Sequence, residues 1–373
     1  MRSKKLIILL IVVAVVMSSN VFSKKKDPVV QMAILLDTSG SMSGLIEQAK
    51  MQLWKIVNEM ATAKRGKRSP LIEVALYEYG KSSIPASKGY IRMLVPLTTD
   101  LDRISEELFK LKTNGGSEYC GMVIDKAVND LIWNKSNKEY KVIFIAGNEP
   151  FTQGSVNYKD SCRSAISNGI IVNTIFCGPF QTGVNTSWKD GADISDGSYM
   201  NIDHNRKIVH IKAPQDEEII KLGKALNKTY ISYGKIGAEM KERQKKQDLN
   251  AGSMSPGVMV ERSAAKASKQ YRNTSWDLVD AEKEGTVKVE EIASDELPAE
   301  MKDMSTDEKK AYVKKKSKER QKLQKKIQVL KKEREKFVKG KRIEMSKDKT
   351  LDDAIINALK KQASKKKYKF EKK

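Results

Sequence analysis

Apolar residues gather in short, regularly spaced runs over the first two thirds of the chain. Residues 29–36 are almost uninterruptedly apolar and have the length of a strand, and similar runs occupy 71–77, 141–146 and 170–176. A strand that is apolar on both faces is typical of the interior of a parallel sheet with helices on both sides. The pattern therefore predicts a central, mainly parallel sheet.

Segments in which apolar residues have helical spacing separate these strands and follow the last of them. They are 45–60, a segment that opens at Thr99 and Asp100, 122–133, 158–167, and a helix from Pro214 to about Tyr230 that follows a last strand at about 199–211. Parallel neighbouring strands need crossover connections. The alternation therefore predicts a doubly wound α/β domain over residues 27–234 with helices on both faces of the sheet.

From Lys235 the chain is charged and rich in Gln, which predicts a charged helical extension over 235–340. Ser305 to Glu308 fit a capping box, and the helix that they start is expected to reach about Val338. Its heptad core positions alternate between apolar Val313, Leu323, Ile327, Leu330 and Phe337 and basic Lys316, Arg320 and Arg334. This is half of a coiled-coil pattern. Dimerisation and folding back, either onto 271–279 or onto the main domain, are both open.

The two ends of the chain carry different signals. Residues 1–23 combine early positive charge, the apolar run 6–17 and small residues, as in a cleaved signal peptide. About 12 apolar residues are too few for a hydrocarbon layer of roughly 30 Å, although an uncleaved membrane anchor is the alternative. We therefore expect a periplasmic or secreted protein. Residues 341–373 form a basic tail, in which a short helix near Thr350 and Asp353 precedes a Lys-rich terminus that we expect to be disordered.

The cysteines do not indicate a particular chemistry. An exported protein lies in an oxidising compartment, where one pair among Cys120, Cys162 and Cys177 could form a disulfide. Burial as small apolar side chains is at least as good an interpretation. None of the three has the paired spacing of a zinc site.

The formal net charge of +23 predicts attraction to anionic partners without sequence selectivity. Aromatic residues are sparse in the basic tail, so a stacking platform for single-stranded nucleic acid is not indicated. Together with the expected export, the charge favours an anionic envelope polymer or anionic lipid as the partner of the basic tail, and no nucleic acid.

The residues that follow the first strand have the chemistry of a cation site. Asp37, Ser39 and Ser41 are spaced two apart in a loop bent by Gly40. In a doubly wound sheet the carboxyl end of a central strand is where ligands bind. An Asx turn with a helix cap is the simpler alternative, since Asp, Ser and Gly are common at such junctions.

The segment from Leu35 to Met42, LLDTSGSM, resembles the metal-ion-dependent adhesion site of von Willebrand factor type A domains. The resemblance covers about 27–234 and implies that Asp37 acts largely through water while Ser39 and Ser41 ligate directly. The family's threonine ligand falls on Ser117 in the Gly-Gly-Ser loop, with Thr113 in reserve. Segments 229–234 and 271–280 look like a secreted bacterial subgroup of this family without an assigned function.

One family position departs from the pattern. Where these domains place an aspartate after the fourth strand, this chain has Gly147, so that Asn148 or Glu149 would have to supply the missing oxygen. Glu149 is the candidate ligand, and a solvated residue in the loop before Pro150 is the equal alternative for it. A set of hydroxyl and carboxylate oxygens suits Mg²⁺, Mn²⁺ or Ca²⁺.

The resemblance implies that an acidic residue of a protein partner fills the open coordination position. We therefore expect a metal-dependent binding or adhesion module and no enzyme. His204 and His210 have no Ser or Cys nucleophile beside them, and a Gly-Lys-Ser/Thr phosphate loop is absent from the sequence. The alternative is a structural or assembly component of the envelope that acts through its basic helices and keeps only a vestigial metal site.

Overall fold

A computed structural model describes residues 27–202, 211–344 and 351–371; the expected signal peptide lies outside them. Within these residues six strands form one sheet in the order β4-β3-β1-β5-β6-β7, parallel except for β4. The strands are β1 (Val29–Asp37), β3 (Leu71–Tyr79), β4 (Ile91–Thr98), β5 (Tyr140–Gly147), β6 (Ile170–Cys177) and β7 (Tyr199–Ile202). The predicted doubly wound, mainly parallel sheet is confirmed.

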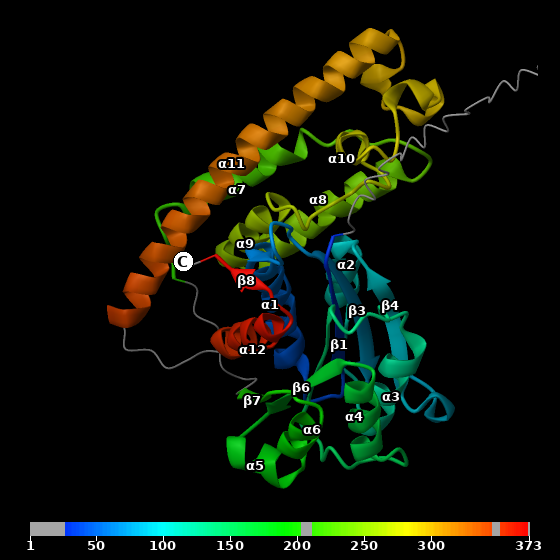
Figure 1. The fold of residues 1–373 in the computed structure, drawn as a ribbon, viewed down its shortest axis with the longest axis vertical. Helices are drawn as coiled ribbons and strands as arrows, with labels where there is room; N and C mark the ends of the chain where they lie inside the picture. Colours follow the sequence, from blue (N-terminus) through cyan, green and yellow to red (C-terminus); the bar gives the residue numbers. More distant parts are fainter. Residues whose placement is uncertain (1–26, 203–210, 345–350, 372–373) are drawn as a thin grey trace, which may run out of the picture.

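Helices cover both faces of the sheet (Figure 1). One face packs against α1 (Ser43–Ala61) and α2 (Leu101–Lys110), and the other packs against α3 (Cys120–Asp130), α4 (Tyr158–Ser167) and α6 (Trp188–Ile194). The short α5 (Phe180–Asn185) precedes α6. In β1, Met32 and Leu36 enter the first core, whereas Ala33 and Leu35 enter the second. Burial on both sides explains why this strand is apolar throughout.

The sequence did not reveal strand β4, which pairs antiparallel with β3 at the edge of the sheet. It contains the exposed Arg92 and Pro96. Proline cannot donate a hydrogen bond to a neighbouring strand, so it is tolerated at an edge and hides the strand from pattern analysis.

Two predicted boundaries at the end of the domain differ from the structure. The described part of the last strand ends at Ile202, and residues 203–210, with His204 and His210, lie outside the described residues. Helix α7 (Asp216–Asn227) begins after Pro214 and not at it. The reason is that the Asp216 carboxylate accepts a hydrogen bond from the backbone N of Ala213 at 3.0 Å, which places the turn before the helix.

The extension consists of helices, as predicted. It contains α8 (Gly237–Met254), α9 (Pro256–Lys266), α10 (Leu278–Glu284), three short 3-10 segments (Val289–Glu291, Ser294–Glu296 and Ala299–Met301) and the 39-residue α11 (Thr306–Glu344). The capping box is present: the backbone N of Ser305 donates to Glu308 at 2.8 Å, and the backbone N of Glu308 donates to the Ser305 hydroxyl at 3.4 Å.

Helix α11 folds back onto its own chain, the second of the two arrangements left open by the sequence. Its Arg320 bonds to Asp277 at 2.5 Å and to Asp280 at 2.8 Å, and it lies 4.0 Å from the centre of the Tyr230 ring. Arg334 bonds to Asp216 at 2.6 Å. Arg320 and Arg334 therefore face acids of other segments of this chain, whereas Lys316 donates to the backbone carbonyl of Lys228 at 3.0 Å.

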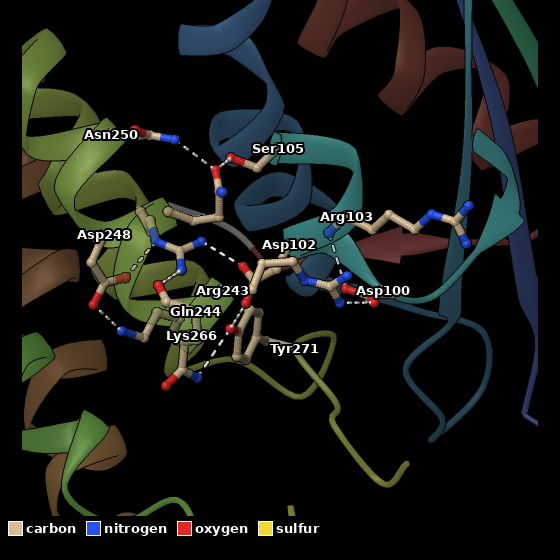
Figure 2. Close-up of polar contacts among 12 residues, drawn as sticks. Asp100, Asp102, Arg103, Ser105, Arg243, Gln244, Asp248, Asn250, Lys266 and Tyr271 are labelled. Carbon is tan, nitrogen blue, oxygen red and sulfur yellow. Dashed lines mark hydrogen bonds and ion pairs between the residues drawn. The ribbon is translucent and has the colours of Figure 1, made fainter. Parts of the chain in front are cut away.

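A buried cluster of charges joins the α/β domain to the extension (Figure 2). Arg262 of α9 is fully buried and bonds to Asp102 of α2 at 2.7 Å and to Asp248 of α8 at 2.5 Å. Lys266 bonds to Asp248 at 2.7 Å, and Tyr271 donates to Asp102. Two cations thus meet two carboxylates, which is the condition for burying such charges without a large penalty.

The C-terminal residues pack onto the α/β domain. Helix α12 (Leu351–Lys365) buries Leu359 and Ala363 in the core with α1, and Gln362 accepts a hydrogen bond from Tyr140 at 2.8 Å. After it, β8 (Lys369–Phe370) pairs antiparallel with β2 (Ala63–Lys64). The expectation of a disordered Lys-rich terminus is therefore wrong for residues 366–371, because buried Tyr368 holds this segment against the core.

The three cysteines are free and buried, so the described structure contains no disulfide between them. None of the described helices has the length and apolar character needed to cross a membrane.

The docked terminus predicts a stability effect. Leu359→Ala removes a fully buried side chain and should lower the free energy of unfolding by about 2–4 kcal/mol. Lys361→Ala, on the exposed side of the same helix, should change it by less than about 0.5 kcal/mol. Urea unfolding of the two variants checks this; equal effects would show that α12 is not docked in solution.

The buried cluster predicts a dependence of stability on pH. Burial alone would raise the pKa of Asp248, but Arg262 and Lys266 lower it to about 2. Because the folded value lies below the ordinary value of 3.8, the unfolded chain binds the proton more readily. Asp248 therefore stabilises the fold above about pH 4, by about 2 kcal/mol, and this contribution is lost as the pH falls through 2.

Urea unfolding between pH 5 and pH 2 measures this contribution as the difference between wild type and Asp248→Asn. The variant should be less stable at pH 5, because Arg262 and Lys266 lose a counter-charge, and its stability should fall less on acidification. Parallel pH profiles for the two proteins would contradict the assignment.

Candidate metal site

The loop between β1 and α1 turns around the side chain of Asp37. Asp37 is the last residue of β1 and is fully buried, and its Oδ1 accepts a hydrogen bond from the backbone N of Ser39 at 2.7 Å. The backbone N of Met42 then bonds to the carbonyl of Ser39 at 3.1 Å. This is the Asx turn considered for the sequence, and it fixes Ser39 beside the carboxylate.

A second loop, residues 111–119, is held by backbone hydrogen bonds against the first loop and against the loop that follows β3. The backbone N of Asn114 donates to the carbonyl of Thr38 at 3.0 Å, and the backbone N of Ser82 donates to the carbonyl of Gly115 at 2.6 Å. At Gly116 a Cβ atom would come within 2.7 Å of the carbonyl oxygen of Gly80. The glycines therefore allow the backbones to approach closely.

The second loop places the carboxyl group of Glu118 beside Asp37. Glu118 is only 4% exposed. Room for its side chain exists because residue 80 is a glycine, with φ of +76°: a Cβ atom there would lie 2.7 Å from Cγ of Glu118 and 2.8 Å from Oδ1 of Asp37. Two buried carboxyl groups thus face each other at the carboxyl end of the central strand.

The electrostatics of this pair are unfavourable without a cation. Burial and then the neighbouring Asp37 raise the pKa of Glu118 to about 9. Burial also raises the pKa of Asp37, while contacts with Glu118 and Ser39 oppose the rise. Among the described residues no Lys or Arg pairs with either carboxyl group, in contrast to Glu78 nearby, which pairs with Arg92 and Lys81. A buried pair of this kind ionises fully only when a counter-charge is present, and otherwise retains a proton.

Several buried oxygen atoms around Asp37 lack a hydrogen-bond partner. They are Oδ2 of Asp37, Oγ of Ser39, Oε2 of Glu118 and Oδ1 of Asn148. Buried polar atoms are nearly always satisfied, so a group of orphaned oxygens in one place indicates a missing ligand. Carboxylate, hydroxyl and amide oxygens are the donors that hard divalent cations prefer. The residues present therefore fit Mg²⁺, Mn²⁺ or Ca²⁺.

The described residues contain no group of three or more His, Cys, Asp or Glu side chains arranged to hold a metal ion. A cation at Asp37 would depend on the pair of carboxyl groups together with hydroxyl and amide oxygens. This set of oxygen donors favours hard divalent cations over softer metals, which prefer imidazole or thiolate.

The predicted ligand residues differ in burial and in their contacts. Ser39 is buried against Asp37, and Ser41 is exposed and accepts a hydrogen bond from Asn148 at 3.3 Å. Glu149 is half-buried, and its charge contributes to the raised pKa of Asp37 and of Glu118. Ser117 precedes Glu118 directly and is half-buried.

Thr113, the reserve candidate, is also half-buried. No hydrogen bond among the described residues connects the hydroxyl group of Ser117 or of Thr113 to the other candidates. The choice between these two hydroxyls therefore stays open.

Crowding explains the glycine at position 147. Its φ is not positive. A Cβ atom there would lie 2.6 Å from the hydroxyl oxygen of Tyr79 and 3.2 Å from Oδ2 of Asp37. Tyr79 is buried and donates to the carbonyl of Ala146 at 2.9 Å, so it cannot move aside easily. The space that an aspartate would need is occupied.

Sequence reasoning missed Glu118. The signal was present, because an acidic residue directly follows the Gly-Gly-Ser segment that was selected as a ligand loop. The family pattern directs attention to the hydroxyl of Ser117, so the carboxyl group of the next residue was not considered. Its burial could be recognised only from the packing of the loop against Gly80.

The fold and site define a doubly wound α/β domain with an acidic oxygen cluster at the end of its central strand. The family model of the von Willebrand factor type A domain matches residues 31–199. This chain therefore contains a domain of that family, followed by a helical extension that lies outside the match. The resemblance stated from the motif is confirmed.

Several solved structures are similar to about half of the chain. BatB from Bacteroides thetaiotaomicron is 15% identical, with 47% of this chain and 90% of that chain covered and a TM-score of 0.35. An aerotolerance-related membrane protein from Bacteroides fragilis is 17% identical, with 47% and 92% covered and a TM-score of 0.33. The SpRpn10 VWA domain is 15% identical, with 47% and 88% covered and a TM-score of 0.35. No curated protein matches the sequence.

Proposed function

We propose that this protein is an exported, non-enzymatic binding module that holds one divalent cation at Asp37 and uses it to bind an acidic group of a protein partner. The cluster of orphaned buried oxygens around Asp37 is the observation that carries the proposal. Asp37, Ser39 and Ser41 would hold the cation, with Ser117 and Glu149 as further candidates. Mg²⁺ is the preferred ion, and Mn²⁺ and Ca²⁺ share its donor preference.

Recognition is favoured over catalysis by the groups that surround the site. Burial raises the pKa of the Cys120 thiol well above its ordinary value, so this cysteine is a poor nucleophile. Tyr79 is likewise buried with a raised pKa, and its hydroxyl is engaged by Ala146. A bound cation with an open position would supply attraction for a carboxylate, which needs no activated nucleophile.

A second candidate function rests on the outer side of α11. Seven lysines of α11 lie three, four or seven residues apart, spacings that keep side chains on one face of a helix. They are Lys315, Lys318, Lys322, Lys325, Lys332, Lys336 and Lys339, all exposed. The row spans about 36 Å at 1.5 Å per residue and contains no acidic residue. Figure 1 shows α11 along the outer edge of the extension.

This lysine row lacks the internal partners of the inner side of α11. Lys332 lies 3.6 Å from Glu371, and the other six lysines form no ion pair with described residues. Val329, half exposed, interrupts the row and lines a mostly apolar hollow of about 450 Å³. The other lining residues are Leu330, three lysines and one acid: Lys322, Lys325, Lys326 and Glu218. Cationic side chains around an apolar hollow suit an anionic amphiphile. We therefore propose an anionic lipid surface as the partner of the lysine row.

The metal proposal predicts that Ser39→Ala weakens Mg²⁺ binding at least about ten-fold, because it removes an oxygen without a partner in the metal-free protein. Isothermal titration calorimetry of the full chain with Mg²⁺ measures this. Ser253→Ala changes an exposed serine of α8. It is the matched control and should bind Mg²⁺ as the wild type does. Equal binding by Ser39→Ala would refute the site assignment.

The lipid proposal predicts a loss of vesicle binding when Lys315, Lys318, Lys322 and Lys325 are replaced by Gln. Each lysine near an anionic surface contributes about 1 kcal/mol, so the four changes should weaken binding by at least about 100-fold. Glutamine preserves helix propensity. Co-sedimentation with vesicles of phosphatidylcholine containing phosphatidylglycerol, and with phosphatidylcholine alone, measures the effect.

The control for this experiment removes the same charge elsewhere, through Gln at the exposed Lys88, Lys112, Lys135 and Lys138 of the α/β domain. It should bind the anionic vesicles within a few-fold of wild type. Equal losses in both variants would mean that net charge alone attracts the protein. Binding to soluble inorganic polyphosphate but not to vesicles would replace the lipid with a polymer.

A further inference from the structure

We propose that Glu118 supplies the second carboxylate of the metal site, in place of the carboxylate that Gly147 cannot provide. The inference rests on the proposed binding of a cation at Asp37. It assigns a charged ligand to the 111–119 loop, where the family pattern has only a hydroxyl. The second negative charge of the site would then come from this loop and not from the end of strand β5.

The position of Glu118 is built into the backbone. Its loop is fixed to the β1 loop by the hydrogen bond from Asn114 to Thr38, and its own backbone N donates to the side chain of Gln153. Gly80 leaves the space through which the side chain reaches Asp37. The result is a carboxyl group that is 4% exposed with one oxygen, Oε2, lacking any partner.

Within the described part of the chain, this carboxyl group has no cationic partner. No described Lys or Arg forms an ion pair with Glu118, whereas buried Glu78, on the neighbouring strand, has two. A glutamate that served only to pack the loop would lose nothing by being an amide or an apolar residue. Its burial against Asp37 is therefore explained best by a ligand that attracts both carboxylates.

Gly147 and Glu118 are complementary parts of one arrangement. The Tyr79 hydroxyl group occupies the volume that a side chain at 147 would enter, 2.6 Å from the point where a Cβ atom would lie. On the other side, Gly80 gives up its side chain so that Glu118 can enter. With Asp37 and Glu118 both ionised, two negative charges would offset the charge of a divalent cation. The second charge would replace the one that an aspartate at position 147 would supply.

The experiment titrates Mg²⁺ alone into the full chain by calorimetry, for wild type, Glu118→Gln, Ser39→Ala and Glu149→Gln. Asp130→Asn, an exposed acid on α3, is the control for loss of one charge. We expect Glu118→Gln to weaken Mg²⁺ binding by at least about ten-fold, because affinity falls with the number of charged ligands. Asp130→Asn should stay within about two-fold of wild type.

Thermal unfolding provides a readout that a merely structural role would not give. Without metal, Glu118→Gln should melt close to the wild-type temperature, because the amide has nearly the shape of the carboxyl group and adds no buried charge. With saturating Mg²⁺, only the wild type and Asp130→Asn should gain stability substantially. A variant that melts lower without metal and keeps the full Mg²⁺-dependent gain would show that Glu118 only packs the loop.

The outcomes separate this inference from the function on which it rests. If Ser39→Ala loses Mg²⁺ binding while Glu118→Gln binds as wild type does, the site stands and the role of Glu118 is refuted. If Glu149→Gln alone weakens binding, the second carboxylate is Glu149. If the wild type itself binds no Mg²⁺, both the inference and the proposed metal-dependent function fail.

Discussion

The burial of strand β1 on both faces is the constraint on which the structure depends. Its side chains alternate between two hydrophobic cores, so neither face can carry charge, and the first acidic residue can appear only where the strand leaves the sheet. That residue is Asp37, which is still fully buried because the loops from β3 and from 111–119 close over it. The same packing that forms the core therefore produces a carboxylate that lacks water and needs a counter-charge.

The distribution of positive charge follows a second constraint. The net charge of +23 is too large to be neutralised within the molecule, yet the cations at the centre of the extension meet acids. Arg262 and Lys266 face Asp102 and Asp248, and Arg320 faces Asp277. The uncompensated lysines lie on the outer side of α11, where water solvates them. The charges inside the extension are thus paired, and the excess charge lies at the surface.

Packing around Asp37 determines where a second carboxyl group can lie. The space around Asp37 decides which side chains can reach it. Tyr79 occupies the volume beside position 147, and Gly80 opens a volume on the opposite side that Glu118 fills. Two buried carboxyl groups therefore meet at the end of β1, although position 147 carries none.

The sequence by itself determined the α/β fold, the strand β1 with Asp37 at its end, and the helical character of the extension, because apolar periodicity and turn residues act locally. It did not reveal β4, whose Pro96 conceals an edge strand, nor the docking of residues 351–371, where lysines outnumber the few apolar residues that are buried. Only the tertiary structure decided that α11 folds back, since the acids that pair with Arg320 and Arg334 lie some 40 to 118 positions away in the chain. The meeting of Glu118 with Asp37 is of the same kind. Contacts between distant segments depend on how loops pack, and no local pattern in the sequence records that packing.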